Sequence, residues 1–184
     1  MQEDFFLSYI RYMTEYIKSR EFFEENSDSQ KNRKHPIIIC WKLNTPNNMG
    51  SILRIADNMA CEKVLFVDDE PSFRERNIKK TAQSSYKAVE WHFCKTDEWQ
   101  QHIPEGYKLL AIETAEPSTN LYRTELPEKC AFFLGNEMVG LDRETLKNCE
   151  KAVYIPMMGH NKSMNVSQAL SVVLGEWQRQ NYFK

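Results

Sequence analysis

One stretch, residues 36–67, limits the fold of this chain more than any other. Residues 36–43, PIIICWKL, form a continuous apolar run rich in isoleucine, which is typical of a strand buried on both faces. Residues 44–50 are predicted to form a turn, residues 51–60 a helix and residues 63–67 a second strand. Two strands joined through a helix run in the same direction, so this unit predicts a parallel sheet.

The rest of the chain continues the alternation of strands and helices. Further strands are predicted at residues 88–93, 107–113, 130–134 and 153–155, and further helices at residues 96–102, 142–148 and 166–182. Trp99 is expected to anchor the first of these helices, and Asp142 to cap the second. Residues 68–86 are charged and show no period, so we expect an irregular segment there. The pattern predicts an α/β fold in which helices flank a mainly parallel sheet.

Length and composition fit one domain with a small N-terminal extension. The 184 residues are 41% hydrophobic, enough to remove roughly 70% of the unfolded surface from water on folding. We expect the domain at residues 36–184 and the extension at residues 1–35. Apolar side chains at helical spacing in residues 1–24 favour an amphipathic helix, packed on the body or on a partner chain, over a surface that stacks on nucleic acid. Residues 24–35 are polar and are expected to form a linker.

The sequence argues against several classes of protein. No apolar run approaches the ~20 residues that span a bilayer, and the N-terminus lacks the basic start of a signal peptide, so we expect a cytoplasmic protein without membrane contact. The five cysteines stand singly and the four histidines are scattered, which disfavours disulfides, zinc and other metal sites. Glycine-rich phosphate loops and the GxSxG and HExxH motifs do not occur in the sequence.

Two short clusters of basic residues are candidates for contact with nucleic acid: Lys31, Arg33 and Lys34 in the first, and Arg74, Arg76, Lys79 and Lys80 in the second. The formal net charge is −2 and the isoelectric point is about 6.1, so the chain is not a polycation. Any binding of nucleic acid must therefore come from such local patches. Solvated loops are the alternative interpretation of these clusters.

Two later stretches look like strand ends that face one pocket. FFLGNEMVGL, residues 132–141, and VYIPMMGHNKSMNVSQAL, residues 153–170, each begin as a short apolar run, break at glycine or proline and then become polar. Ligands of open α/β sheets bind at the carboxyl ends of the strands. Ser163, Asn165 and Ser167 then open the last helix, whose free backbone N–H groups suit a polar or anionic ligand. Helix capping alone also explains these three residues.

Together, three stretches resemble the motifs of the SpoU/TrmH branch of the SPOUT RNA 2′-O-methyltransferases. They are NNMGSILRIA at residues 47–56, FLGNEMVGL at residues 133–141 and IPMMGHNKSMNVSQAL at residues 155–170, and their order, spacing and strand contexts match the family. The resemblance implies S-adenosylmethionine as the cofactor and a ribose 2′-hydroxyl of tRNA or rRNA as the methyl acceptor. It also implies a C-terminal deep trefoil knot and a homodimer in which each subunit completes the other's site.

The resemblance also assigns residues. Its catalytic positions fall on Asn48, Arg54, Glu137, Ser163 and Asn165, and its cofactor contacts on Thr114, Gly135, Ile155 and Met164. An arginine in a protein does not readily lose its proton, so we expect Arg54 to grip the target phosphate and stabilise a developing alkoxide. In this hypothesis Asn48 positions Arg54, while the other catalytic positions hold the loops and the ribose.

Some positions depart from the family pattern and leave the substrate open. Ala60 stands where the family commonly has a glycine, and residues 83–86 lack the small Ser-Ala-Gly turn often found there. Residues 160–162, His-Asn-Lys, are particular to the last loop of this chain. We expect tRNA as the substrate because only about 35 residues precede the first strand, too few for a separate RNA-binding domain. The alternatives are an rRNA substrate, a small-molecule acceptor and a non-catalytic RNA-binding module of the same fold.

Overall fold

The computed structural model describes residues 18, 19, 21, 23, 35–71 and 73–183. The chain divides into two units, Met1–Arg33 and Lys34–Lys184. In the first unit, Ser19, Glu21 and Phe23 are helical and exposed. Most of the predicted N-terminal helix, and the basic residues Lys31, Arg33 and Lys34, lie outside the described residues, so these expectations stay predictions.

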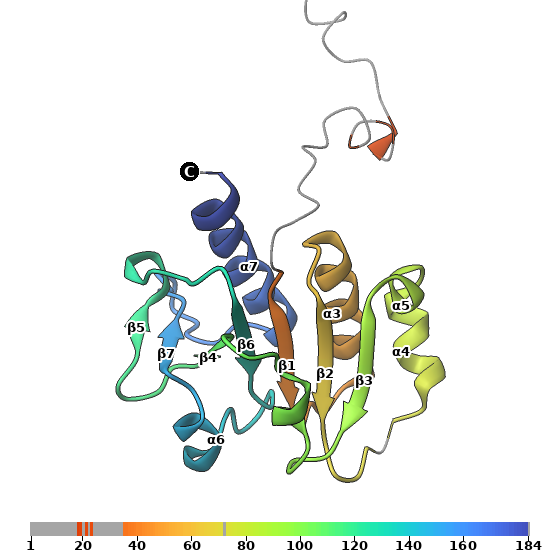
Figure 1. Cartoon of the computed structure of the whole chain (residues 1–184), viewed down its shortest axis with the longest axis horizontal. Helices are drawn as coiled ribbons and strands as arrows, with labels where there is room; N and C mark the ends of the chain where they lie inside the picture. The colour runs from red at the N-terminus through yellow and green to blue at the C-terminus, as the bar shows by residue number, and fades with distance from the viewer. Residues whose placement is uncertain (1–17, 20, 22, 24–34, 72, 184) are drawn as a thin grey trace, which may run out of the picture. The chain divides into compact units, whose positions relative to one another are not determined.

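The second unit is built on a seven-stranded sheet, counted over the described residues, and every strand pair in it is parallel (Figure 1). The strands are β1 (Ile37–Trp41), β2 (Lys63–Val67), β3 (Glu90–Cys94), β4 (Lys108–Ile112), β5 (Thr119–Asn120), β6 (Cys130–Leu134) and β7 (Lys151–Tyr154). Their order across the sheet is β3-β2-β1-β6-β4-β7-β5. The predicted parallel α/β fold is therefore confirmed, and β5 is a short edge strand that we did not predict.

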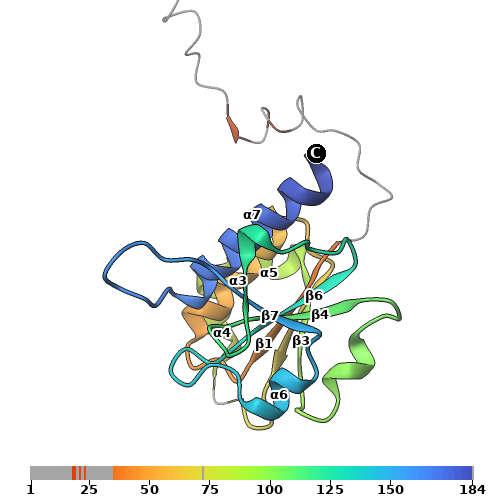
Figure 2. The ribbon, with the colours of Figure 1, turned by 90° about the vertical axis from the view of Figure 1, so that its left-hand side faces the viewer.

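Helices cover the two faces of the sheet unequally. The helices are α3 (Pro46–Asn58), α4 (Glu75–Ala82), α5 (Ser85–Ala88), α6 (Arg143–Lys147) and α7 (Val166–Tyr182), with short 3-10 helices η1 (Trp99–His102) and η2 (Leu121–Arg123). On one face, the apolar side chains of α3, α4 and α7 join one core cluster; on the other, η1 and α6 contribute to a second cluster (Figures 1 and 2).

The two clusters explain the continuous apolar runs. In β1, Ile38 and Cys40 belong to the cluster under α3 and α7, whereas Ile37, Ile39 and Trp41 belong to the opposite one. Successive side chains of a strand point to opposite faces, so a strand covered on both faces has to be apolar at every position.

Several predicted boundaries are confirmed. The strands predicted at residues 63–67 and 130–134 and the helix at residues 166–182 have the bounds of β2, β6 and α7. Asp142 caps α6, because its side chain accepts a hydrogen bond of 2.7 Å from the amide of Thr145. Trp99 is only 2% exposed and anchors its segment as expected, although that segment is the 3-10 helix η1, which starts three residues later than the predicted helix.

Two predictions were wrong. The turn predicted at residues 44–50 is mostly helix, because α3 begins at Pro46 behind the N-cap Thr45, and proline is well suited to a first helical turn. The segment at residues 68–86 is not irregular, since it contains α4 and α5. The helix α4 buries only Ile78 and Ala82, which lie one turn apart, so its apolar face is too short to show a period in the sequence.

The C-terminal part of the chain follows a crossing path. β6 lies between β1 and β4, β7 lies on the far side of β4, and α7 then returns to pack against α3. This path is compatible with the trefoil knot, which stays a prediction. In the part of the chain that the structure describes, no helix is long and apolar enough to cross a membrane.

The contact between α3 and α4 yields a stability prediction. A Cβ atom at Gly50 would lie 2.5 Å from the Cβ of Thr81 and 2.8 Å from the carbonyl oxygen of Ile78. We expect Gly50→Ala to lower the free energy of unfolding by about 1–3 kcal/mol, because the two helices must separate. Urea denaturation measures this change.

The matched control is Gly175→Ala in α7, where a Cβ would meet no atom within 4 Å. That substitution should raise the free energy of unfolding by up to about 1 kcal/mol, because alanine favours the helix over glycine. An equal effect of the two substitutions would contradict the tight contact at Gly50.

Candidate active site

A cavity of about 650 Å³ opens at the carboxyl ends of β4, β6 and β7. Its walls come from both strand-end stretches of the sequence and from the first turn of α3. This confirms that the two stretches face one pocket. The volume is that of a site for a small molecule or cofactor.

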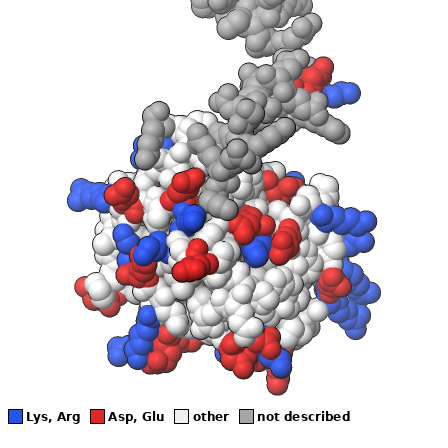
Figure 3. Space-filling model, in the orientation of Figure 1, with Lys and Arg blue, Asp and Glu red and all other residues white. Residues whose placement is uncertain are grey.

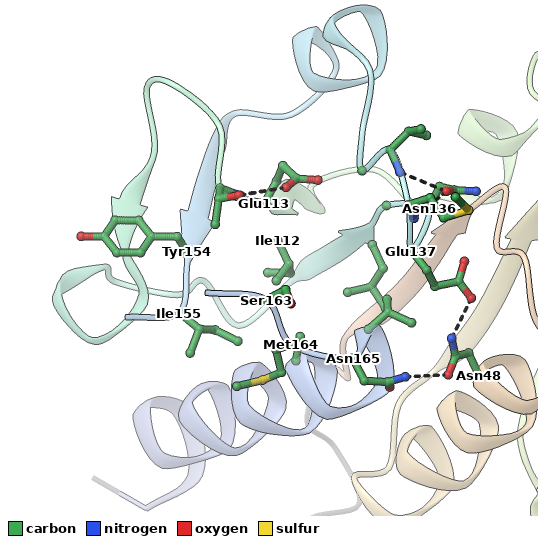
Figure 4. A pocket seen from close by; sticks show the side chains of 18 of the residues that line it. Asn48, Ile112, Glu113, Asn136, Glu137, Tyr154, Ile155, Ser163, Met164 and Asn165 are labelled. Carbon is green, nitrogen blue, oxygen red and sulfur yellow. Dashed lines mark hydrogen bonds between the residues drawn. The ribbon is translucent and has the colours of Figure 1, made fainter. Parts of the chain in front are cut away.

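The loop after β6, residues 135–141, is held tightly by its two glycines. A Cβ at Gly135 would lie 2.6 Å from the carbonyl carbon of Gly140, and Gly140 itself has a φ of +69°. The backbones of Asn136 and Gly140 exchange two hydrogen bonds, of 3.3 and 2.9 Å. These contacts make the loop a closed turn that projects the side chain of Glu137 towards α3 (Figure 4).

The Glu137 carboxylate joins this loop to the start of α3. It accepts hydrogen bonds from the amide of Asn44 at 2.7 Å, from the side-chain amide of Asn48 at 2.7 Å and from the hydroxyl of Thr45 at 3.2 Å. Partial burial acts to raise the pKa of Glu137, but hydrogen bonds from Asn44, Asn48 and Thr45 outweigh it and hold the pKa below its ordinary value. Glu137 is therefore ionised at neutral pH and acts as an acceptor.

Asn48 extends the connection to the last helix. The side-chain amide of Asn165 donates to the side-chain oxygen of Asn48 at 2.9 Å. Asn165 is also the N-cap of α7, since its side-chain oxygen accepts from the amide of Ser167 at 2.9 Å and from its hydroxyl at 2.6 Å. Figure 4 shows Glu137 and Asn165 converging on Asn48 from two sides. Three of the five predicted catalytic residues thus form one hydrogen-bonded chain, and the capping interpretation of Asn165 also holds.

Ser163 and the four predicted cofactor residues, Thr114, Gly135, Ile155 and Met164, all line the cavity. Figure 4 shows Ser163, Met164 and Ile155 on the side of the cavity away from Glu137. Ser163 is exposed, and its hydroxyl lies 3.0 Å from the side-chain oxygen of Asn161 in the same loop. The structure therefore places these residues together as expected, with Ser163 held by its own loop.

Arg54 does not lie in this cavity. It is exposed and makes no hydrogen bond or ion pair with any residue that the structure describes. It follows Asn48 by six residues, which is about 9 Å along the helix axis, and the side chain of Asn48 is engaged by Glu137 and Asn165. The expected positioning of Arg54 by Asn48 is thus not present within one copy of the chain.

Two site residues were missed from the sequence. Glu113 accepts from the amide of Thr114 at 2.9 Å and from the amide of Leu141 at 3.0 Å, which fixes the end of the Glu137 loop. Asn136 donates to the carbonyl of Lys42 at 2.5 Å and accepts from the side chain of Asn44 at 3.1 Å. The sequence did offer a signal for Glu113, because it is a carboxylate at the end of a predicted buried strand, where α/β sheets bind their ligands.

The charges and walls of the cavity suit a ligand with a cationic group and an apolar part. Glu113 and Glu137 contribute two carboxylates to the cavity wall. Lys162 also lines the cavity, and its amine donates a hydrogen bond of 2.9 Å to the carbonyl of Met157. Apolar walls come from Ile112, Leu134, Val153, Ile155 and Ala169. Among the described residues, no three His, Cys, Asp or Glu side chains are grouped so that they could hold a metal ion.

Two solved structures share this fold. The SpoU methyltransferase AviRb from Streptomyces viridochromogenes, in complex with AdoMet, superposes with a TM-score of 0.72 at 20% identity, over 81% of this chain and 58% of that chain. A structure described as giving insights into the 2-OH methylation of C/U34 on tRNA superposes with a TM-score of 0.73 at 21% identity, over 82% of this chain and 99% of that chain. The fold is therefore that of SpoU-type methyltransferases.

The sequence comparison identifies the family. The model of the SpoU rRNA Methylase family matches residues 35–175, so the chain belongs to this family. The 23S rRNA (guanosine-2′-O-)-methyltransferase RlmB of Neisseria meningitidis is 30% identical over 149 residues, which are 80% of this chain and 60% of that protein.

A second relative is the tRNA (guanosine(18)-2′-O)-methyltransferase of Escherichia coli K12, which is 26% identical over 151 residues, or 80% of this chain and 65% of that protein. The chain thus spans about 60% of the length of such relatives. The resemblance inferred from the three motifs is confirmed at the level of the family.

The lowered pKa of Glu137 predicts a pH dependence of stability. Because the folded-state pKa lies below the ordinary value of 4.5, the ionised carboxylate stabilises the fold above that pH and loses its contribution as the pH falls through the folded-state value. We expect wild type to be more stable than Glu137→Gln at pH 7, and the difference to shrink below about pH 4.5. Urea denaturation of both proteins between pH 7 and pH 3.5 measures it. A difference that stays constant over this range would contradict the ionised acceptor.

Proposed function

We propose that this protein is an S-adenosylmethionine-dependent RNA methyltransferase that modifies a ribose 2′-hydroxyl, with tRNA as the favoured substrate and the cytoplasm as its place of action. The observation that supports it most is the cavity in which the family's motif residues Asn48, Glu137 and Asn165 meet by hydrogen bonds. The family's relatives carry names of rRNA and tRNA 2′-O-methyltransferases.

The residues of the cavity fit this cofactor. Its sulfonium and amino groups are cationic, and the cavity offers the carboxylates of Glu113 and Glu137. The apolar walls at Ile112, Val153 and Ile155 suit an adenine ring, and the backbone of the Gly135 loop supplies polar groups at the edge. Bound there, S-adenosylmethionine supplies an electrophilic methyl group.

The protein's part in the reaction is to place and activate a hydroxyl. The chain of Glu137, Asn48 and Asn165 fixes the loops that face the ribose, and Glu137, being ionised, stays an acceptor. Arg54 grips the target phosphate through its planar fork of donors and stabilises the developing alkoxide. The hydroxyl proton leaves through phosphate or water, since a guanidinium cannot accept it.

Two copies of the chain pair to complete the site. Arg54 lies outside the cavity of its own chain, so a partner copy is the source of the guanidinium that the proposed reaction needs. Near the cavity, Met138, Val139 and Met158 are 85%, 82% and 94% exposed, and such large apolar side chains favour burial against another protein surface. These exposed residues support a homodimer.

The test of this function is a methylation assay with product mapping. Purified protein is incubated with methyl-labelled S-adenosylmethionine and total tRNA or total rRNA that lack their native modifications, and mass spectrometry of nuclease digests locates the label. We expect a new 2′-O-methyl nucleoside in tRNA. A mark only in rRNA would overturn the tRNA substrate, and no mark in either RNA would overturn the proposed activity.

Arg54→Ala separates the chemical role of this residue from cofactor binding. We expect kcat to fall at least about 100-fold, because an oxyanion-stabilising group is lost, while calorimetric affinity for S-adenosylmethionine stays within about twofold. The control is Arg123→Ala, another exposed arginine outside the cavity, which should keep wild-type kcat. Methylation by Arg54→Ala at the wild-type rate would refute the role assigned to Arg54.

A further inference from the structure

The outer face of α4 carries a dense group of cations. Arg74, Arg76, Lys79 and Lys80 fall within seven residues, and all four side chains are exposed. Along a helix they cover about 9 Å, so they form one compact group. We name this group the α4 surface. In the orientation of Figure 1, Figure 3 shows lysine and arginine side chains gathered along the edge of the molecule where α4 lies.

The cations of the α4 surface are available to a ligand. None of the four forms an ion pair with a described residue, whereas Lys108 and Lys147 elsewhere are paired with Glu150 and Glu144. The acid within α4, Glu75, accepts a hydrogen bond from the hydroxyl of Tyr86 and forms no ion pair with a described residue. The amine of Lys79 lies 5.9 Å from the centre of the Tyr86 ring, close enough for a cation–π contact that restricts this side chain without neutralising it.

The packing of α4 brings the α4 surface next to the helix of the candidate active site. Gly50 of α3 is in contact with Ile78 and Thr81, and the hydroxyl of Thr81 donates to the side-chain oxygen of Asn47 at 3.1 Å. Arg54 follows Gly50 by one helical turn, so it lies on the same side of α3, the side that packs against α4. Asn48, next to Asn47, lines the cavity.

We infer that the α4 surface is the docking site for the sugar-phosphate backbone of the RNA substrate, which continues past Arg54 towards the partner's cavity that Arg54 completes. This inference rests on the proposed function. The chain has a net charge of −2, so general basic charge cannot attract RNA, and four cations that form no ion pair with a described residue make a local site for phosphates. Exposed cations along one short helix suit a backbone that is read by charge, with no contact to base edges.

The experiment compares RNA binding by two variants of equal charge. In Arg76→Gln/Lys79→Gln/Lys80→Gln the α4 surface loses three cations. In the control, Lys108→Gln/Lys147→Gln/Lys151→Gln, three exposed cations are lost away from α4. The probe is total tRNA without native modifications, in the absence of cofactor, titrated at several salt concentrations. The backbone contribution to affinity is independent of sequence, so this probe reports it even where the true target is another RNA.

We expect the α4 variant to bind the probe at least about tenfold more weakly at 50 mM salt, with the slope of log K against log salt reduced by about 2, because each phosphate contact contributes ~0.7. The control should keep the wild-type affinity and slope. Calorimetric affinity for S-adenosylmethionine should be unchanged in both variants, which shows that they are folded. An α4 variant with wild-type affinity and slope would overturn the inference, and so would equal weakening in the two variants. Because methylation is not the readout, either failure is distinguishable from failure of the proposed function.

Discussion

The Glu137 carboxylate is the interaction on which the rest of the site depends. This one side chain, from the loop after β6, accepts hydrogen bonds from the backbone amide of Asn44, the hydroxyl of Thr45 and the side-chain amide of Asn48. The side-chain oxygen of Asn48 in turn accepts a hydrogen bond from Asn165 at the start of α7. Residues 44–48, Glu137 and Asn165 are far apart in the sequence, and these hydrogen bonds form only when the three segments are brought together in this arrangement. A charged acceptor of this kind makes stronger hydrogen bonds than a neutral one, and it specifies geometry as well as energy.

The parallel sheet makes such a network possible. Because all strands run the same way, the ends of β1, β4, β6 and β7 meet at one edge, and their loops must share the space there. Glu113 adds a second connection by accepting from the amide of Leu141, so the loop at residues 135–141 is tied to the start of α3 through Glu137 and to the end of β4 through Glu113. The rigid core beneath, apolar on both faces of β1 and β6, leaves this edge as the place where polar chemistry is concentrated.

The parts of the structure that follow from local pattern could be predicted from the sequence. Continuous apolar runs located β1, β2 and β6, and the three motifs located Asn48, Glu137 and Asn165, whose convergence follows from their positions at strand and helix ends. What depends on tertiary packing could not be predicted. The helix α4 buries only two side chains, the role of Glu113 requires its strand to lie beside the Leu141 loop, and the absence of Arg54 from the cavity depends on the rotation of α3.

A double-mutant cycle on Glu137 and Asn165 tests the central claim most directly. The two side chains are connected through Asn48, so removing either one should weaken the connection that the other makes. The free energy of unfolding is measured by urea denaturation for wild type, Glu137→Ala, Asn165→Ala and the double variant. We predict a coupling energy of about 0.5 kcal/mol or more, the level that marks residues of one network. Strict additivity of the two substitutions would contradict the view that Glu137 organises the site.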